Sequence, residues 1–262
     1  MDTLLLYLTL GAFAGTLAGL LGAGGGLVMV PVLVFIFQGQ AIHSSVIMHM
    51  ALGTSLAIIM LTSLSSIRAH HQRSAVLWPV CWRLTPGIVL GAFSGAVVAD
   101  ALPDGILKPV FAIFELLVAL QMWFTIKPAA QRNMPDWPGM SLTGWVIGVV
   151  SAIVGIGGGT LTVPFLIWCR VSIHNAVATS AACGLPIAVA GTLGFIATGW
   201  DEAGLPEMSS GYVYWPAFAA VAITSMLFAP LGARLAHALP ADRLKKGFAI
   251  FLAMLGIRML LA

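Results

Sequence analysis

The sequence predicts an all-α integral membrane protein built from two inverted-topology repeats of about five hydrophobic segments each. Of the 262 residues, 60% are hydrophobic and only 8% are charged. A soluble domain carries about 25% charged residues, so this chain cannot cover a surface in water. Uncharged runs such as 4–29 and 141–169 exceed the roughly 20 residues that cross a bilayer. A pattern of glycines and prolines occurs twice. Eight to ten membrane segments are therefore expected.

The first repeat, residues 1–126, is expected to contain five segments. The first helix ends at a glycine cluster, a short helix of about half a membrane thickness follows, and three long helices complete the repeat. Asp2 places an acid where a signal peptide carries basic residues, so the first segment is expected to be permanent. The expected ranges are 3–21, 27–37, 43–69, 77–99 and 105–125.

The second repeat, residues 140–262, follows the same order. A polar, proline-containing stretch at 127–139 is the expected linker between the repeats. A second polar loop is expected at 200–211. The expected helices are 140–154, 160–169, 172–198, 212–236 and 241–261.

Matching residues recur at nearly constant spacing, which indicates an internal duplication. Pro31 matches Pro164 at a spacing of 133. At a spacing of 125, His49 matches His174 and Thr54-Ser55 matches Thr179-Ser180. Further matches occur at a spacing of 137: Trp78-Pro79 with Trp215-Pro216, and Pro103, Leu107, Lys108, Phe111, Ala112, Ile113 and Phe114 with Pro240, Leu244, Lys245, Phe248, Ala249, Ile250 and Phe251.

The charged loops indicate how the repeats are oriented. The loop after the long third segment carries Arg68 and Arg73, whereas its counterpart carries Asp201, Glu202 and Glu207. Because basic loops stay cytoplasmic, the matching loops are expected on opposite sides of the membrane. The repeats are then inverted, and both termini lie on the non-cytoplasmic face. Inverted repeats with broken helices are typical of transporters that work by alternating access.

The two glycine clusters are the main candidates for a substrate site. Each glycine weakens a helix by about 1 kcal/mol relative to alanine. A helix that restarts after such a break presents unpaired N–H groups and a partial positive charge, which favour an anion. Thr160 and Thr162 add hydroxyl groups in the second repeat. The alternative is close helix packing through glycine. The candidate glycines are Gly22, Gly24, Gly25, Gly26, Gly155, Gly157, Gly158 and Gly159.

Polar residues within the long third segments are further candidates for substrate binding. Thr54, Ser55, Thr179 and Ser180 are expected to face the glycine breaks and to complete a cage of neutral donors. His49 and His174 precede them and are candidates for donating to an anion or moving a proton. The alternative for both sets is that they form hydrogen bonds between helices.

Two ionisable residues are candidates for coupling and gating. Glu115 is a carboxylate deep within a predicted span, where such groups often serve function, so it is a candidate for proton coupling. Its alternative role is a neutral, hydrogen-bonded lock between helices. Arg68 is expected to end a helix at the cytoplasmic face and to attract anions as a gate; alternatively it only sets topology.

The motifs of several other protein classes are missing from the sequence. The glycine clusters lack the Gly-Lys-Ser/Thr of a phosphate-binding loop, and no nucleophile elbow is present. The three cysteines, Cys81, Cys169 and Cys183, are scattered and predict neither a metal site nor a disulfide framework. We therefore expect no catalytic residues, no metal, no cofactor and no nucleic-acid partner.

The sequence resembles the sulfite exporter TauE/SafE family, also called the 4-toluene sulfonate uptake permease family. The resemblance covers both halves of the chain. It rests on the motifs at 19–26 with Pro31, at 54–55, at 63–71, at 155–159 with Pro164, at 178–181 and at 191–192.

The resemblance implies a multipass transporter in a bacterial cytoplasmic membrane, with sulfite, sulfonates or sulfoacetate as the class of substrate. Family members are assigned to both export and uptake, so the direction stays open. We therefore expect a secondary transporter for a small sulfur-containing anion, with protons as a candidate coupling ion and the lipid bilayer as its surroundings. The alternatives are a permease for another small anion or an anion channel without coupled turnover. The sequence leaves the oligomeric state open.

Overall fold

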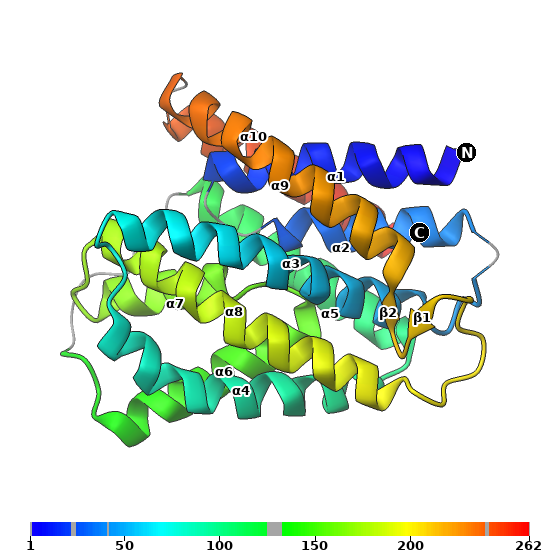
Figure 1. Cartoon of the computed structure of the whole chain (residues 1–262), viewed down its shortest axis with the longest axis horizontal. Coiled ribbons are helices and arrows are strands. Elements are labelled where there is room, and N and C mark those ends of the chain that lie inside the picture. The colour runs from blue at the N-terminus through cyan, green and yellow to red at the C-terminus, as the bar shows by residue number, and fades with distance from the viewer. Residues whose placement is uncertain (1, 22–24, 41, 125–132, 239–240, 262) are drawn as a thin grey trace.

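The computed structural model describes residues 2–21, 25–40, 42–124, 133–238 and 241–261, which form ten α-helices and one short hairpin (Figure 1). The all-α class expected from composition is confirmed. The first five helices are α1 Asp2–Leu21, α2 Gly26–Gln38, α3 Ile47–Gln72, α4 Trp78–Asp100 and α5 Asp104–Trp123. The second five are α6 Trp137–Val154, α7 Gly159–Trp168, α8 Ile173–Thr198, α9 Trp215–Ala238 and α10 Ala241–Leu261.

Several helices are long and apolar enough to cross a membrane. Five meet both conditions within the described residues, namely α3, α4, α5, α6 and α8. Shorter apolar stretches lie at 3–17, 26–38, 159–168 and 215–229. Large apolar side chains also cover the outside of the bundle, among them Leu90, Leu193 and Leu227, each more than half exposed. An apolar outer surface of this kind is suited to lipid, and the protein is a multipass membrane protein.

The helix starts follow local sequence. Tryptophan-proline pairs open α4, α6 and α9, and proline at the first positions of a helix loses no intrahelical hydrogen bond. Ser172 caps α8, because its hydroxyl oxygen accepts a hydrogen bond from the N–H of Asn175. The observed ends of the helices fall within about four residues of the expected ones.

The main helix contacts each join one helix from residues 1–126 to one from residues 137–261. Helix α4 packs on α6, α1 on α9, α3 on α8 and α5 on α10. The first two contacts use glycine, since a Cβ atom at Gly144 would collide with the carbonyl of Leu84, and one at Gly11 would collide with that of Val221. Gly11 matches Gly144 at the spacing of 133, and Leu84 matches Val221 at the spacing of 137. The spacings of the sequence repeat therefore recur in three-dimensional contacts.

The hairpin before α9 departs from the prediction. Strand β1, Ser209–Ser210, pairs antiparallel with β2, Val213–Tyr214. Residues 212–214 were expected to be helical, and that prediction was wrong. Gly211, with φ of 51°, makes the turn so close to the end of α8 that a Cβ atom would collide with Ile196. The expected linker 127–139 lies partly outside the described residues, and 137–139 belong to α6.

Candidate functional site

Both short helices begin at a glycine in a left-handed conformation. Gly25 has φ of 71° before α2, and Gly158 has φ of 72° before α7. These two glycines match at the same spacing as the prolines Pro31 and Pro164. A side chain at either glycine would strain the backbone, so glycine is required there. The candidates Gly22 and Gly24 lie outside the described residues.

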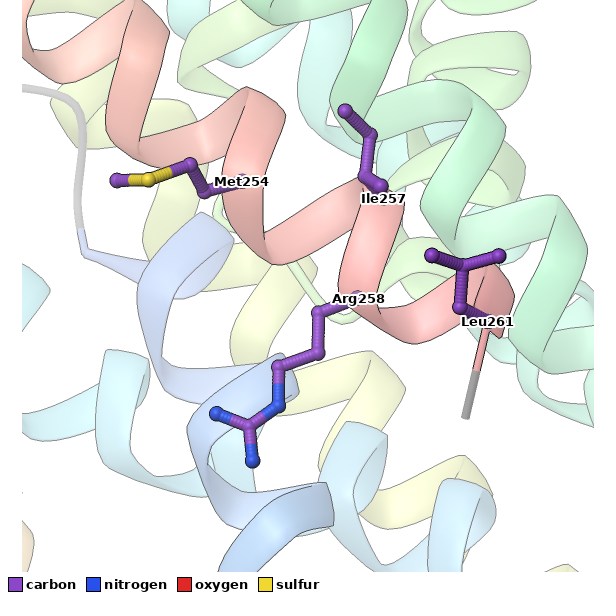
Figure 2. A pocket seen from close by; sticks show the side chains of 4 residues that line it. All are labelled: Met254, Ile257, Arg258 and Leu261. Atoms are coloured by element: carbon purple, nitrogen blue, oxygen red, sulfur yellow. The ribbon is translucent and has the colours of Figure 1, made fainter.

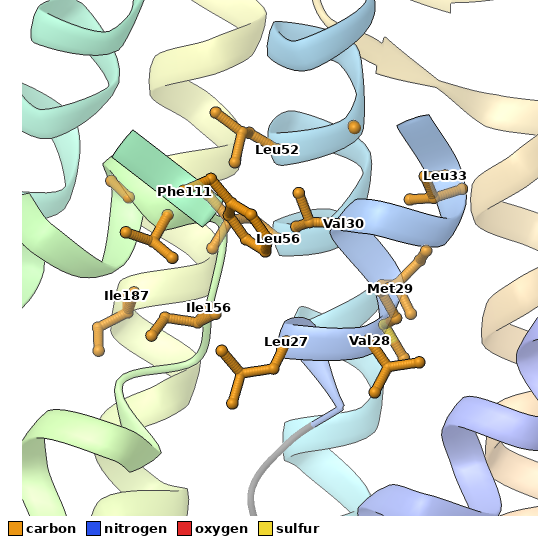
Figure 3. Close-up of a cluster of buried hydrophobic side chains, with 14 of the residues drawn as sticks. Leu27, Val28, Met29, Val30, Leu33, Leu52, Leu56, Phe111, Ile156 and Ile187 are labelled. Atoms are coloured by element: carbon orange, nitrogen blue, oxygen red, sulfur yellow. The ribbon is translucent and has the colours of Figure 1, made fainter. Parts of the chain in front are cut away.

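The two glycine breaks meet inside the bundle. A Cβ atom at Gly26 would lie 3.0 Å from the carbonyl oxygen of Gly155 and 3.1 Å from the Cα atom of Ile156. Figure 3 shows Leu27, at the start of α2, beside Ile156 in the second break, with Ile187 of α8 next to them. All three side chains are buried. The structure thus brings the two clusters together as a tight backbone-to-backbone contact that favours glycine.

The contact of Gly26 with Gly155 and Ile156, called the crossing from here on, lies at the middle of the two longest helices. A Cβ atom at Gly26 or at Gly157 would lie 3.0 Å from the side chain of Ile59, which is halfway along α3. A Cβ atom at Gly184, halfway along α8, would lie 3.0 Å from the carbonyl oxygen of Gly157. Each of these helices has 26 residues and so spans about 39 Å. The crossing is therefore buried far from both helix ends.

The Thr-Ser pairs have separate roles. The Ser55 hydroxyl donates to the carbonyl oxygen of Gly155 over 2.9 Å, which ties α3 to the second break. Thr54 accepts a hydrogen bond from the N–H of Tyr214 over 3.1 Å, just before α9. At the matching place Thr179 accepts from the N–H of Leu77 over 3.0 Å, just before α4. Ser180 is buried. The bonds of Thr54 and Thr179 thus tie separate segments of the bundle together, which is the alternative to substrate binding that was stated for these residues.

A set of hydroxyl groups around the start of α7 is left without hydrogen bonds. Among the residues that the structure describes, none pairs with the hydroxyl of Ser151, Thr160 or Thr162, and all three hydroxyl oxygens are buried. A Cβ atom on Gly158 would lie 3.4 Å from the Thr162 oxygen and 3.5 Å from the Ser151 oxygen. Sequence reasoning did not select Ser151. Its only signal was a hydroxyl residue one turn before Gly155 in an apolar helix.

The two histidines lie in different settings. His49 is buried, and its Nδ1 lies 2.9 Å from a carboxylate oxygen of Asp104. Its Nε2 lies 3.0 Å from the carbonyl oxygen of Ala99. Both partners are acceptors, so this geometry favours a hydrogen on each ring nitrogen. His174 is exposed at the start of α8. The structure therefore does not bring the two histidines together.

Tyr212 completes the polar cluster around His49. Its ring stacks on the imidazole with the centroids 4.9 Å apart. Its hydroxyl donates to Asp100 over 2.8 Å. Burial, and then the hydrogen bond to Asp100, raises the pKa of the Tyr212 hydroxyl well above its usual range, so it stays a donor. The cluster fixes the start of α3 to the corner between α4 and α5.

The two ionisable candidates differ in burial. Glu115 is fully buried, and within the described part of the chain neither carboxyl oxygen has a hydrogen-bond partner. It lies on the buried face of α5 with Phe111 and Ala119. Its alternative role as a hydrogen-bonded lock therefore finds no partner among those residues. Arg68 is exposed near the end of α3.

Two surface hollows adjoin α10, and no residue of either glycine break lines them. One, of about 380 Å³, is lined by Met254, Ile257, Arg258 and Leu261 (Figure 2). The Arg258 guanidinium lies 4.3 Å from the ring centroid of Phe35 in α2. The other, of about 410 Å³, is an apolar groove between α5 and α10. Their apolar walls on the outer surface are suited to lipid chains.

The chain is similar to probable membrane transporter proteins over nearly its whole length. It is 39% identical to a probable membrane transporter protein of Haemophilus influenzae, with 98% of each chain covered. It is 30% identical to a probable membrane transporter protein of Methanocaldococcus jannaschii, over 98% of this chain and 95% of that one. The probable membrane transporter protein YdhB of Bacillus subtilis is 26% identical, over 94% and 96%. Residues 7–259 match the family described as sulfite exporter TauE/SafE, and the chain belongs to that family.

Proposed function

We propose that this protein is a secondary transporter that moves a small sulfur-containing anion, of the sulfite, sulfonate or sulfoacetate class, across the bacterial cytoplasmic membrane by alternating access. The contact of Gly26 with Gly155 and Ile156 carries the proposal, because it brings the start of α2 against the break between α6 and α7 inside the bundle. The family supports transport, and its description as sulfite exporters supports the substrate class.

An anion suits the chemistry of the crossing. The first N–H groups of α2 and α7 have no intrahelical acceptor, and the helix dipole adds partial positive charge there. The side chains beside the two breaks, such as Leu27, Ile156 and Thr162, are buried and neutral. Neutral donors hold an anion without the strong attraction of a buried arginine, which favours release on the other side of the membrane.

The helix contacts support alternating access between inverted repeats. Each main contact pairs one helix from each part of the chain, and the glycine contacts repeat at matched spacings. Leu27 and Ile156 are almost fully buried at the crossing. An anion therefore reaches it only when helices move apart. In this proposal Glu115 takes up and releases the coupling proton, and Arg68 draws anions toward one entrance.

Counterflow in proteoliposomes tests the proposal. Vesicles loaded with unlabelled sulfite should take up labelled sulfite faster than empty vesicles do, because a carrier returns faster when it is loaded. Uptake without this trans-stimulation would show a channel. Exchange of small carboxylates but not of sulfite, methanesulfonate or sulfoacetate would show a permease for another anion.

A further inference from the structure

We propose that Ser151, Thr160 and Thr162, together with the first turn of α7, form the oxyanion-binding subsite of the transporter. The subsite takes the charged end of a sulfite or sulfonate through neutral O–H and N–H donors. This inference rests on the proposed function and deepens it. It also assigns recognition of the anion to one repeat rather than to both.

The unpaired hydroxyl groups are the first observation. Ser151 and Thr162 are each 0% exposed, and no hydrogen-bond partner for either hydroxyl occurs among the described residues. The Thr160 hydroxyl oxygen is also buried and unpaired there. A buried polar group without a partner is unfavourable and rare in native proteins. Three of them around one helix start indicate a ligand that supplies the missing acceptor.

The start of α7 is the second observation. The N–H groups of Leu161 and Thr162 donate to the carbonyl oxygen of Gly158 over 3.1 and 2.8 Å. The N–H groups of Gly159 and Thr160 come before them and have no intrahelical acceptor. The hydroxyl oxygens of Thr162 and Ser151 would lie 3.4 and 3.5 Å from a Cβ atom on Gly158. Hydroxyl and N–H donors thus gather at the positive end of a ten-residue helix.

The first repeat lacks these hydroxyl groups. At the spacing that relates Pro31 to Pro164, the counterparts of Ser151, Thr160 and Thr162 are Ala18, Leu27 and Met29. Leu27 and Met29 are buried among apolar side chains (Figure 3). The first repeat therefore offers an apolar wall where the second offers donors. An organic group on a sulfonate would rest against that wall, beside Ile156.

Binding measured on the purified full-length protein tests the subsite. The melting temperature would be followed while sulfite, sulfate, methanesulfonate or phosphate is added, since a ligand of the native state raises it by mass action. We expect Ser151→Ala and Thr162→Val to weaken sulfite binding at least tenfold. Their melting temperatures without anion should equal or exceed that of the wild type, because an unpaired buried hydroxyl is removed.

Ser225→Ala is the matched control. Ser225 is 1% exposed, and its hydroxyl also has no partner among the described residues, but it lies in α9 against Gly15. We expect this variant to bind sulfite like the wild type.

The possible outcomes separate the subsite from the proposed function. Equal binding by all four proteins would overturn the subsite, while counterflow of sulfite would still uphold the transporter. Absence of any anion-induced shift in the wild type would overturn the subsite as well. A response to phosphate alone, lost in Ser151→Ala and Thr162→Val, would uphold the subsite and overturn the sulfur substrate class.

Discussion

Glycine is favoured at and near the crossing by close contacts with neighbouring atoms as much as by the backbone angle. Gly158 needs both, because its φ is 72° and a side chain would collide with Ile187. At Gly26 the contact alone favours glycine, since a Cβ atom would lie 3.0 Å from the carbonyl oxygen of Gly155. Ser55 then secures that carbonyl with a hydrogen bond. At the residue scale the site is a backbone crossing, and side chains hold it in place.

Glu115 provides a test of coupling at this scale. We expect Glu115→Gln to fold and to keep anion exchange, but to lose acceleration of uptake by a pH gradient, because an amide cannot release a proton. Uptake into proteoliposomes with and without the gradient measures this. Glu207→Gln, which removes an exposed carboxylate from the loop before α9, is the control and should keep the full response. An unchanged gradient response in Glu115→Gln would refute proton coupling at this residue.

At the scale of elements, helix ends are joined by polar contacts from distant parts of the chain. One oxygen of Asp104, in the first turn of α5, accepts from the N–H of Met48 at the start of α3 over 3.0 Å. The other oxygen pairs with His49. A single carboxylate therefore accepts from a free N–H of α3 and pairs with the buried imidazole of the next residue. The negative charge of Asp104 also interacts favourably with the partial positive charge at the N-terminal ends of α3 and α5.

Removal of this charge should loosen the start of α3. We expect Asp104→Asn to lower the free energy of unfolding by about 1–3 kcal/mol, because it leaves the buried His49 ring without its carboxylate partner. Unfolding in detergent would measure the change. Asp201→Asn makes the same substitution at an exposed loop position and should have little effect. If His49 and Asp104 act as a pair, adding His49→Gln to Asp104→Asn should lower the free energy of unfolding little further. Losses of free energy that add up in the double variant would argue against the pairing.

The whole molecule is held by pairs of helices that each join the two parts of the chain. Such pairs must move relative to one another if access alternates, since Leu27 and Ile156 otherwise keep the crossing covered. Helices α4 and α8 form one of these contacts, and the sulfur atoms of Cys81 and Cys183 lie 3.8 Å apart across it. These thiols offer a way to test whether the two helices separate during transport.

Cross-linking Cys81 to Cys183 should slow transport. In a Cys169→Ser background, a membrane-permeant thiol oxidant such as diamide would form the disulfide between them. We expect uptake to fall several-fold and to recover with dithiothreitol, because the bond prevents α4 from moving away from α8. The same treatment of a Cys169→Ser/Cys183→Ser variant should leave uptake unchanged. Full activity of the cross-linked protein would show that transport needs no separation of this pair.

The sequence by itself determined the class, the helices and the place of the breaks, because these follow from local pattern. Apolar length predicts spans, tryptophan-proline pairs mark helix starts, and left-handed caps need glycine at Gly25 and Gly158. The repeat spacing places Thr54 and Thr179 at matching positions, and in the structure each accepts a hydrogen bond from the N–H just before a helix, α9 or α4.

Only the tertiary structure decided which groups meet. His49 reaches an aspartate 55 residues away, and Ser55 reaches a carbonyl 100 residues away. Ser151 became a candidate only when its hydroxyl proved to be unpaired beside Gly158. The hairpin at 209–214 likewise depends on the close approach of Gly211 to α8. Helices form from contacts within a few residues, whereas hydrogen bonds between helices depend on packing across the whole chain.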